Sequence, residues 1–158
     1  MLASLSLLLL LSSHSPSVSG GATPLRPLTA CAAAPRADVE GALGHALTNG
    51  KEQKTENGSI CQYDGNGGQV TILLQHATEK LDIPAEIRNL QATFPDATMR
   101  EAPGLGKRAV FLDMPDIGTQ LHVIRGDYDY VMVSVLGFGE ASRVAPAAEK
   151  IARRILIR

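Results

Sequence analysis

The chain has 158 residues, 20% of them charged, and a net charge of −1 at pH 7. This balance provides no broad basic surface for nucleic acid and no polybasic patch for an anionic membrane. Trp is absent and aromatic residues make up 4% of the sequence, so rings that could stack on bases or sugars are scarce. These numbers exclude a nucleic-acid-binding protein and indicate one domain with one core.

An apolar, leucine-rich run occupies residues 2–11. A helix needs about twenty apolar residues to cross a bilayer, so this shorter run is typical of the core of a signal peptide. Ser17 and Ser19, followed by Gly20, form a signal-peptidase site. We therefore predict a cleaved signal peptide over 1–19 and an extracytoplasmic protein, secreted or periplasmic, with no membrane span. No Lys or Arg precedes the leucines, which leaves an apolar helix of the fold as the alternative.

The two cysteines, Cys31 and Cys61, allow two incompatible interpretations. In an oxidising compartment they form one disulfide, and closing that loop stabilises the fold by roughly 3 to 4 kcal/mol in the chain-entropy model. Alternatively, the segment 28–31 looks like a bacterial lipobox, and Cys31 becomes a lipidated N-terminus that cannot pair. A long, Pro-containing segment separates this motif from the leucine run, which favours the disulfide over the lipoprotein.

The first elements of the domain are a helix and a β-meander. Residues 20–35 are rich in Pro, Gly and Ala and predict a flexible lead-in, so the domain is expected over 36–158. Apolar spacing predicts a helix over 37–43, which Gly44 ends. Asn57-Gly58 favours a two-residue type I′ turn, and a second turn follows at 65–68. The strands of this meander are expected at 52–56, 59–63 and 69–75.

The remaining elements repeat the pattern of a helix followed by a meander. A helix over 84–94 has Pro84 near its first turn and buries Ile87 and Leu90. Ser142 is expected to N-cap the last helix, with Pro146 in its first turn. The order predicts a single α+β domain, an antiparallel β-sheet covered by helices in an α/β/α sandwich-like arrangement. The later strands are expected at 109–114, 119–125 and 128–136, and the last helix should bury Val144, Ala148, Ile151 and Ile155.

Gly104, Leu105 and Gly106 begin a G-x-G-x-x-A string. A dinucleotide site needs this string to open a helix, whereas here a strand follows. We interpret the three residues as a Gly-rich turn, with a role as a ligand loop as the hypothesis to test. No cofactor is expected.

No pattern of metal ligands or catalytic residues stands out. The segment 64–68 opens like a calcium loop but lacks its later ligands. Asp127 and Asp129 flank a hairpin and are expected to be solvated turn acids, and Arg125-Gly126-Asp127 is ordinary turn chemistry. The sequence therefore predicts no catalytic, cofactor-binding or metal-binding residues. The histidines follow no zinc spacing, and those of the expected domain are His45, His76 and His122.

The chain resembles the small secreted and lipoprotein domains of unknown function that are common in actinobacteria and related bacteria. That resemblance implies a PsbP/Mog1-like α/β/α sandwich over residues 31–158, no established reaction and either a lipidated cysteine or a disulfide. The motifs that carry it are Cys31, Asp38-Val39-Glu40, Ala42-Leu43-Gly44, Cys61-Gln62-Tyr63, Val70-Thr71-Ile72, Pro103-Gly104-Leu105-Gly106 and the Ala-rich terminal helix.

These observations predict an exported, non-catalytic binding or accessory module of the cell envelope. Its partner would be a protein or a small-molecule ligand, bound on the sheet face or at the loop 104–106. One alternative is an extracytoplasmic enzyme with an unrecognised site, which would need a pocket around His122, Asp113 or His76. The other is a lipoprotein tethered through Cys31.

Overall fold

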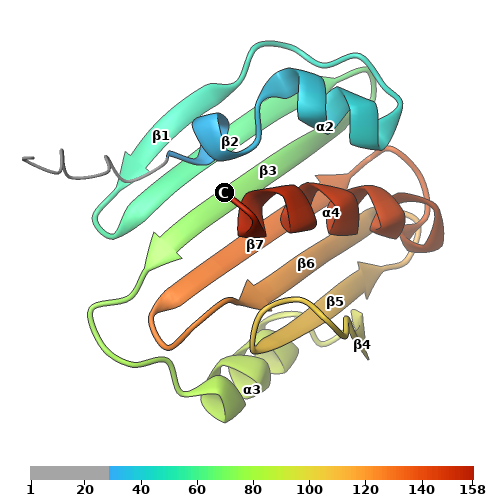
Figure 1. The fold of residues 1–158 in the computed structure, drawn as a ribbon. Coiled ribbons are helices and arrows are strands. Elements are labelled where there is room, and N and C mark those ends of the chain that lie inside the picture. Colours follow the sequence, from blue (N-terminus) through green and yellow to red (C-terminus); the bar gives the residue numbers. More distant parts are fainter. Residues whose placement is uncertain (1–28) are drawn as a thin grey trace, which may run out of the picture.

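The computed structural model describes residues 29–158, and the predicted signal peptide lies outside this part (Figure 1). Within these residues, seven antiparallel strands form one open sheet in the order β1-β2-β3-β7-β6-β5-β4. The helices are α1 (Ala30–Ala33), α2 (Arg36–Leu43), α3 (Ile83–Thr93) and α4 (Ala141–Leu156). The strands are β1 (Lys51–Thr55), β2 (Gly58–Gly65), β3 (Gly68–His76), β4 (Thr98–Glu101), β5 (Arg108–Met114), β6 (Gly118–Ile124) and β7 (Asp129–Leu136).

The arrangement confirms the predicted α+β domain. Helices α1, α2 and α4 cover one face of the sheet, and α3 lies behind it near β5 (Figure 1). The nearly continuous apolar strand β7 is the central strand, with three strands on each side. Helix α4 packs on β5, β6 and β7, whereas α1 packs on β1, β2 and β3. The two ends of the described chain therefore share one helical layer.

Helix α4 docks through the stripe that its sequence predicts. Its apolar residues recur at intervals of three and four, which places them on one side of a helix. Against them, β7 alternates so that every second residue faces the same core. Burying each large aliphatic side chain stabilises the fold by about 2 kcal/mol. The buried residues of this contact are Val144, Ala148, Ile151 and Ile155 on the helix, and Val131, Val133 and Val135 on the strand.

Packing begins earlier than Arg36, where the domain was expected to start. Ala30 and Ala33 in α1 are fully buried. The backbone N–H of Ala30 donates to Oγ of Ser59 at 2.7 Å, which fixes α1 to β2. Alanines suit this position because they let a short helix lie close to the sheet.

The predicted type I′ turn at Asn57-Gly58 is wrong. Thr55 pairs with Gly58, so Glu56 and Asn57 form the two-residue loop. A type I′ turn requires positive φ at both loop residues, and Asn57 does not have it. Gly58 is needed for a different reason, because a Cβ there would lie 1.9 Å from the carbonyl oxygen of Leu74 in β3.

Helix α4 also begins earlier than expected. Its N-cap is Glu140, and the N–H of Val144 donates to the Glu140 carbonyl at 3.2 Å. Ser142 is therefore inside the helix, and the predicted Ser142 cap is wrong. Pro146 becomes the sixth helical residue, beyond the first turn. Because Pro has no N–H, the carbonyl of Ser142 loses its usual i+4 donor.

None of the four helices described has the length and hydropathy of a membrane-spanning segment.

Two isoleucines of α4 provide a test of this packing, because Ile151 is 1% exposed and Ile157, just past the helix end, is 84% exposed. Ile151→Ala is expected to lower the free energy of unfolding by about 2 to 5 kcal/mol, through lost burial and the cavity it leaves. Ile157→Ala should change it by less than about 0.5 kcal/mol. Urea titration measures both, and equal effects would contradict the packing described.

Candidate functional site

Cys31 and Cys61 form a disulfide, with their Cα atoms 5.0 Å apart. The bond ties α1 to β2, and Cys61 is fully buried. Gly50 packs directly against it, since a Cβ there would lie 2.9 Å from Sγ of Cys31. Glu52 accepts a hydrogen bond from the Cys31 N–H at 2.8 Å. The predicted pairing is thus confirmed, and lipidation of Cys31 would require this bond to be absent.

The loop at Gly104, Leu105 and Gly106 has a packing role. The two glycines have φ angles of 77° and 60°, which glycine adopts without strain. Between them, the Leu105 side chain enters the core and is 2% exposed. The loop lines neither of the hollows described below, so its ligand-binding role stays a prediction.

The acids near the hairpins have basic partners on the surface. Asp127 lies 2.6 Å from Nζ of Lys107, and this hydrogen bond lowers the pKa of its carboxyl group. His76 forms a hydrogen bond with Asp129, with Nδ1 2.8 Å from a carboxylate oxygen, and both side chains are exposed. These contacts are typical of solvated turn groups, as the sequence predicts.

Asp64, the first residue of the calcium-like segment, also pairs with a lysine. Its carboxylate accepts from Lys51 at 2.7 Å, from Gln62 at 2.9 Å and from Gln69 at 3.3 Å. These hydrogen bonds, chiefly that of Lys51, lower its pKa to about 2. The carboxylate is thus engaged by side-chain donors of the protein itself.

His122 is the buried histidine of the described chain, at 5% exposure, and it lies on the sheet face opposite α4. Its Nε2 is 3.1 Å from Oε1 of Gln120, and its Nδ1 is hydrogen-bonded to the hydroxyl of Tyr130. An amide oxygen only accepts, so Nε2 carries the proton and the Tyr130 hydroxyl donates to Nδ1. Burial lowers the pKa of His122 to about 4.

The same burial raises the pKa of the Tyr130 hydroxyl, with a smaller contribution from the negative charge of Glu86 in α3. Both ring nitrogens of His122 are hydrogen-bonded, and both the imidazole of His122 and the hydroxyl of Tyr130 are neutral at pH 7. Asp113 lies apart from them, bound to Arg100 at 2.5 Å and Thr119 at 2.6 Å. The three residues that an enzyme hypothesis relied on, His122, Asp113 and His76, thus have separate partners and share no pocket among those described.

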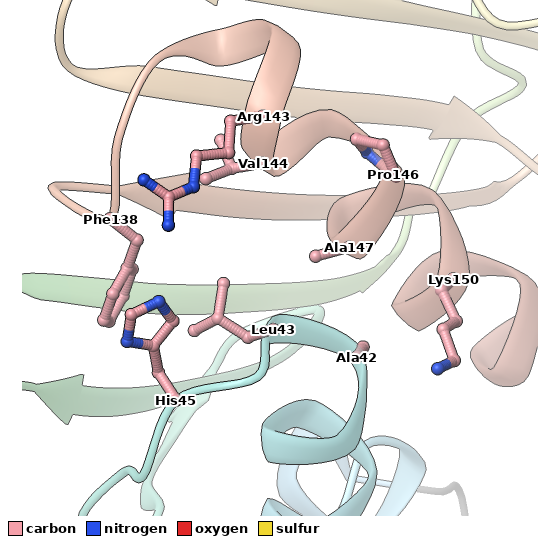
Figure 2. Close-up of a pocket in the computed structure, with 9 residues that line it drawn as sticks. All are labelled: Ala42, Leu43, His45, Phe138, Arg143, Val144, Pro146, Ala147 and Lys150. Carbon is pink, nitrogen blue, oxygen red and sulfur yellow. The ribbon is translucent and has the colours of Figure 1, made fainter.

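A pocket of about 210 Å³ opens between α2 and α4. Its walls come from the end of α2, the segment after it, the β7–α4 loop and one side of α4 (Figure 2). It lies where α2 and α4 meet through short side chains, and Figure 2 shows Ala42 and Ala147 on its two sides. The lining residues are Ala42, Leu43, His45, Phe138, Arg143, Val144, Pro146, Ala147 and Lys150.

The lining combines apolar and basic groups and contains no carboxylate. The ring of His45 lies against that of Phe138, with centroids 5.3 Å apart. Lys150 donates from Nζ to the carbonyl oxygen of Gly41 at 3.0 Å. The side chain of Arg143 makes no hydrogen bond or ion pair within residues 29–158, and Figure 2 shows its guanidinium extending over the pocket from α4.

A second, more open hollow of about 430 Å³ continues along α4. It shares Pro146 and Lys150 with the first, so the two are contiguous. Its arginines have partners: Arg153 binds Glu149 at 2.7 Å, and Arg154 binds Asp38 at 2.5 Å. The full lining is Pro146, Glu149, Lys150, Arg153, Arg154 and Ile157.

Sequence reasoning missed this pocket. It considered His45 only as an isolated histidine and did not single out Arg143 or Phe138. The available signal was on α4, where Arg143 and Lys150 are two helical turns apart and Pro146 lies between them. Comparisons of the chain with protein-family models, with curated proteins and with solved structures found no match. The family resemblance of residues 31–158 therefore stays a prediction.

The buried His122 makes stability dependent on pH. Its pKa falls from 6.5 to about 4 on folding, so the unfolded chain binds the extra proton between these values. Stability is complete above pH 6.5 and falls by roughly 3 kcal/mol as the pH drops to 4. Urea titrations at several pH values measure this loss.

The control for that experiment is His122→Gln, which cannot titrate. Wild type should lose roughly 3 kcal/mol more than the variant between pH 7 and pH 4. Parallel pH profiles of the two proteins would contradict the neutral, buried state assigned to His122.

Proposed function

We propose that the protein is an exported, non-catalytic binding module and that its ligand occupies the pocket between α2 and α4. One observation carries this proposal: a charged side chain, Arg143, extends over a partly apolar pocket and has no partner within the described chain. The other two arginines of α4, Arg153 and Arg154, are paired with carboxylates. An unpaired cation beside apolar groups is available to an incoming ligand.

The chemistry of the pocket supports binding over catalysis. Its nine lining residues include no Ser, Thr, Cys, Tyr, Asp or Glu. A nucleophile with an adjacent base, or a pair of carboxylates, is the usual minimum for hydrolytic catalysis. The buried histidine of the described residues, His122, lies on the opposite face of the sheet with both nitrogens hydrogen-bonded.

Two features support an extracytoplasmic location. The first is the leucine-rich run at residues 2–11. The second is the disulfide between Cys31 and Cys61, which persists in oxidising compartments. A role in the cell envelope follows from these features together with the family resemblance. The competing lipoprotein hypothesis requires the same Cys31 sulfur to carry a lipid.

Mass spectrometry of the protein recovered from an exporting host tests the location. We expect a mature chain that begins at Gly20 and gains two hydrogen atoms on reduction. The reason is that signal cleavage removes residues 1–19 and the oxidising compartment forms the single disulfide. An acylated Cys31 at the N-terminus would favour the lipoprotein, and a chain that keeps Met1 with two free thiols would contradict export.

A fragment screen by calorimetry and NMR tests the pocket, with neutral, cationic and anionic compounds in equal number. Ala42 is half-buried and lines the pocket, so Ala42→Trp should fill it and abolish binding of the ligands found. Ala37 is exposed on the same helix, so Ala37→Trp is the matched control and should leave binding unchanged. Ligands that still bind Ala42→Trp with wild-type affinity would contradict this site, and turnover of a substrate would contradict the non-catalytic role.

A further inference from the structure

We infer that this pocket recognises a small organic anion, a carboxylate or a phosphate ester carried on an aromatic or other apolar group, and that Arg143 contacts the anionic end. The inference rests on the proposed function and assigns the chemical class of its ligand. Three independent features of the pocket carry it: its charge, its apolar walls and an irregularity in α4.

The charge of the pocket is entirely basic. Arg153 and Arg154, on the neighbouring hollow, have carboxylate partners at 2.7 and 2.5 Å. Arg158 reaches Asp38 at 2.7 Å. Arg143 alone among the arginines of residues 141–158 has no such partner in the described structure. Its planar guanidinium provides paired N–H donors that match the two oxygens of a carboxylate or phosphate.

A second donor lies on the same face of α4. Lys150 follows Arg143 by seven residues, which is two helical turns or about 10 Å along the axis. One ammonium proton of Lys150 is directed to the Gly41 carbonyl at 3.0 Å, and an ammonium group has three donors. The lining therefore carries a second cation at another part of the pocket, and it contains no carboxylate that would repel an anion.

The apolar walls accommodate the rest of the ligand. Phe138 and His45 place two rings at one end of the pocket, with their planes inclined at 44°. Leu43 lies between them and α4 (Figure 2). A volume of about 210 Å³ suits a single ring that bears an anionic group. The contiguous hollow, with the exposed side chain of Ile157, leaves space for a longer apolar substituent.

Pro146 is the irregularity, and it lines both hollows. A proline inside a helix removes a hydrogen bond and lowers helix stability. Natural sequences break such local rules mainly at functional sites. The position of Pro146 between Arg143 and Lys150 therefore agrees with selection for a binding surface at this point of α4.

The test is calorimetric titration of phenyl phosphate and benzoate, with benzyl alcohol and benzylammonium as neutral and cationic analogues and inorganic phosphate as the bare anion. We expect the two aromatic anions to bind and the other three probes to bind at least tenfold more weakly. Rising salt should weaken the binding of the aromatic anions, because it screens the charge of the exposed Arg143.

Arg143→Gln should weaken the affinity for phenyl phosphate by at least about tenfold, since it removes a charged donor. Arg143→Lys should keep part of the affinity because it keeps the charge. Arg125 is exposed in the β6–β7 hairpin, at the opposite end of β7 from Phe138, and does not line the pocket, so Arg125→Gln is the matched control and should change affinity by less than twofold.

Two outcomes would overturn the inference. If benzyl alcohol or benzylammonium binds as well as benzoate, and Ala42→Trp removes that binding while Arg143→Gln does not, the pocket binds ligands without selecting anions. The proposed function would then stand and the ligand class would be wrong. If none of the probes binds, this inference fails, and the proposed function fails with it only when the broader fragment screen is also empty.

Discussion

The pairing of β3 with β7 holds the two meanders in one sheet, and the position of the pocket depends on it. The first meander supplies β1 to β3 and the second supplies β4 to β7, with α3 between them along the chain. Opposite residues such as Ile72 and Val133 are fully buried at this junction. Helix α2 lies over the first meander and α4 over the second (Figure 1), so the two helices meet above the junction. The pocket is therefore built from residues of both halves of the chain.

Different interactions stabilise the floor and the rim of this helix contact. On the sides of the helices that face the sheet, Val39 of α2 and Ile151 of α4 are buried in the core, and this apolar burial provides most of the stabilising free energy. At the rim, Asp38 bridges Arg154 and Arg158, and all three side chains are about one-third exposed. Exposed ion pairs contribute little to stability, so they mainly orient α2 against α4.

The sequence allowed most of the fold to be predicted and almost none of the site. Elements with a strong apolar periodicity, such as strand β7 and helix α4, were predicted to within one or two residues at each end. Strand β4 was missed because its four residues, Thr98–Glu101, have no apolar alternation and lie at the sheet edge. The predicted Ser142 cap was wrong because the packing of the helix on the sheet determines which residue becomes the N-cap. The pocket draws His45, Phe138 and Arg143 from separate segments, and no local spacing records that they meet.

The polar groups on the two faces of the sheet differ in whether they have hydrogen-bond partners, and this difference bears on function. On one face, His122 is buried and both of its ring nitrogens are hydrogen-bonded, to the half-buried side chains of Tyr130 and Gln120. A closed network of this kind fixes the packing of β6 and β7 and has no free donor or acceptor on the imidazole for a substrate. On the other face, Arg143 is exposed, charged and without a partner in the described chain, beside apolar side chains. Binding of an anion to a cation in that setting is favourable, so a search for ligands should begin on the helical face.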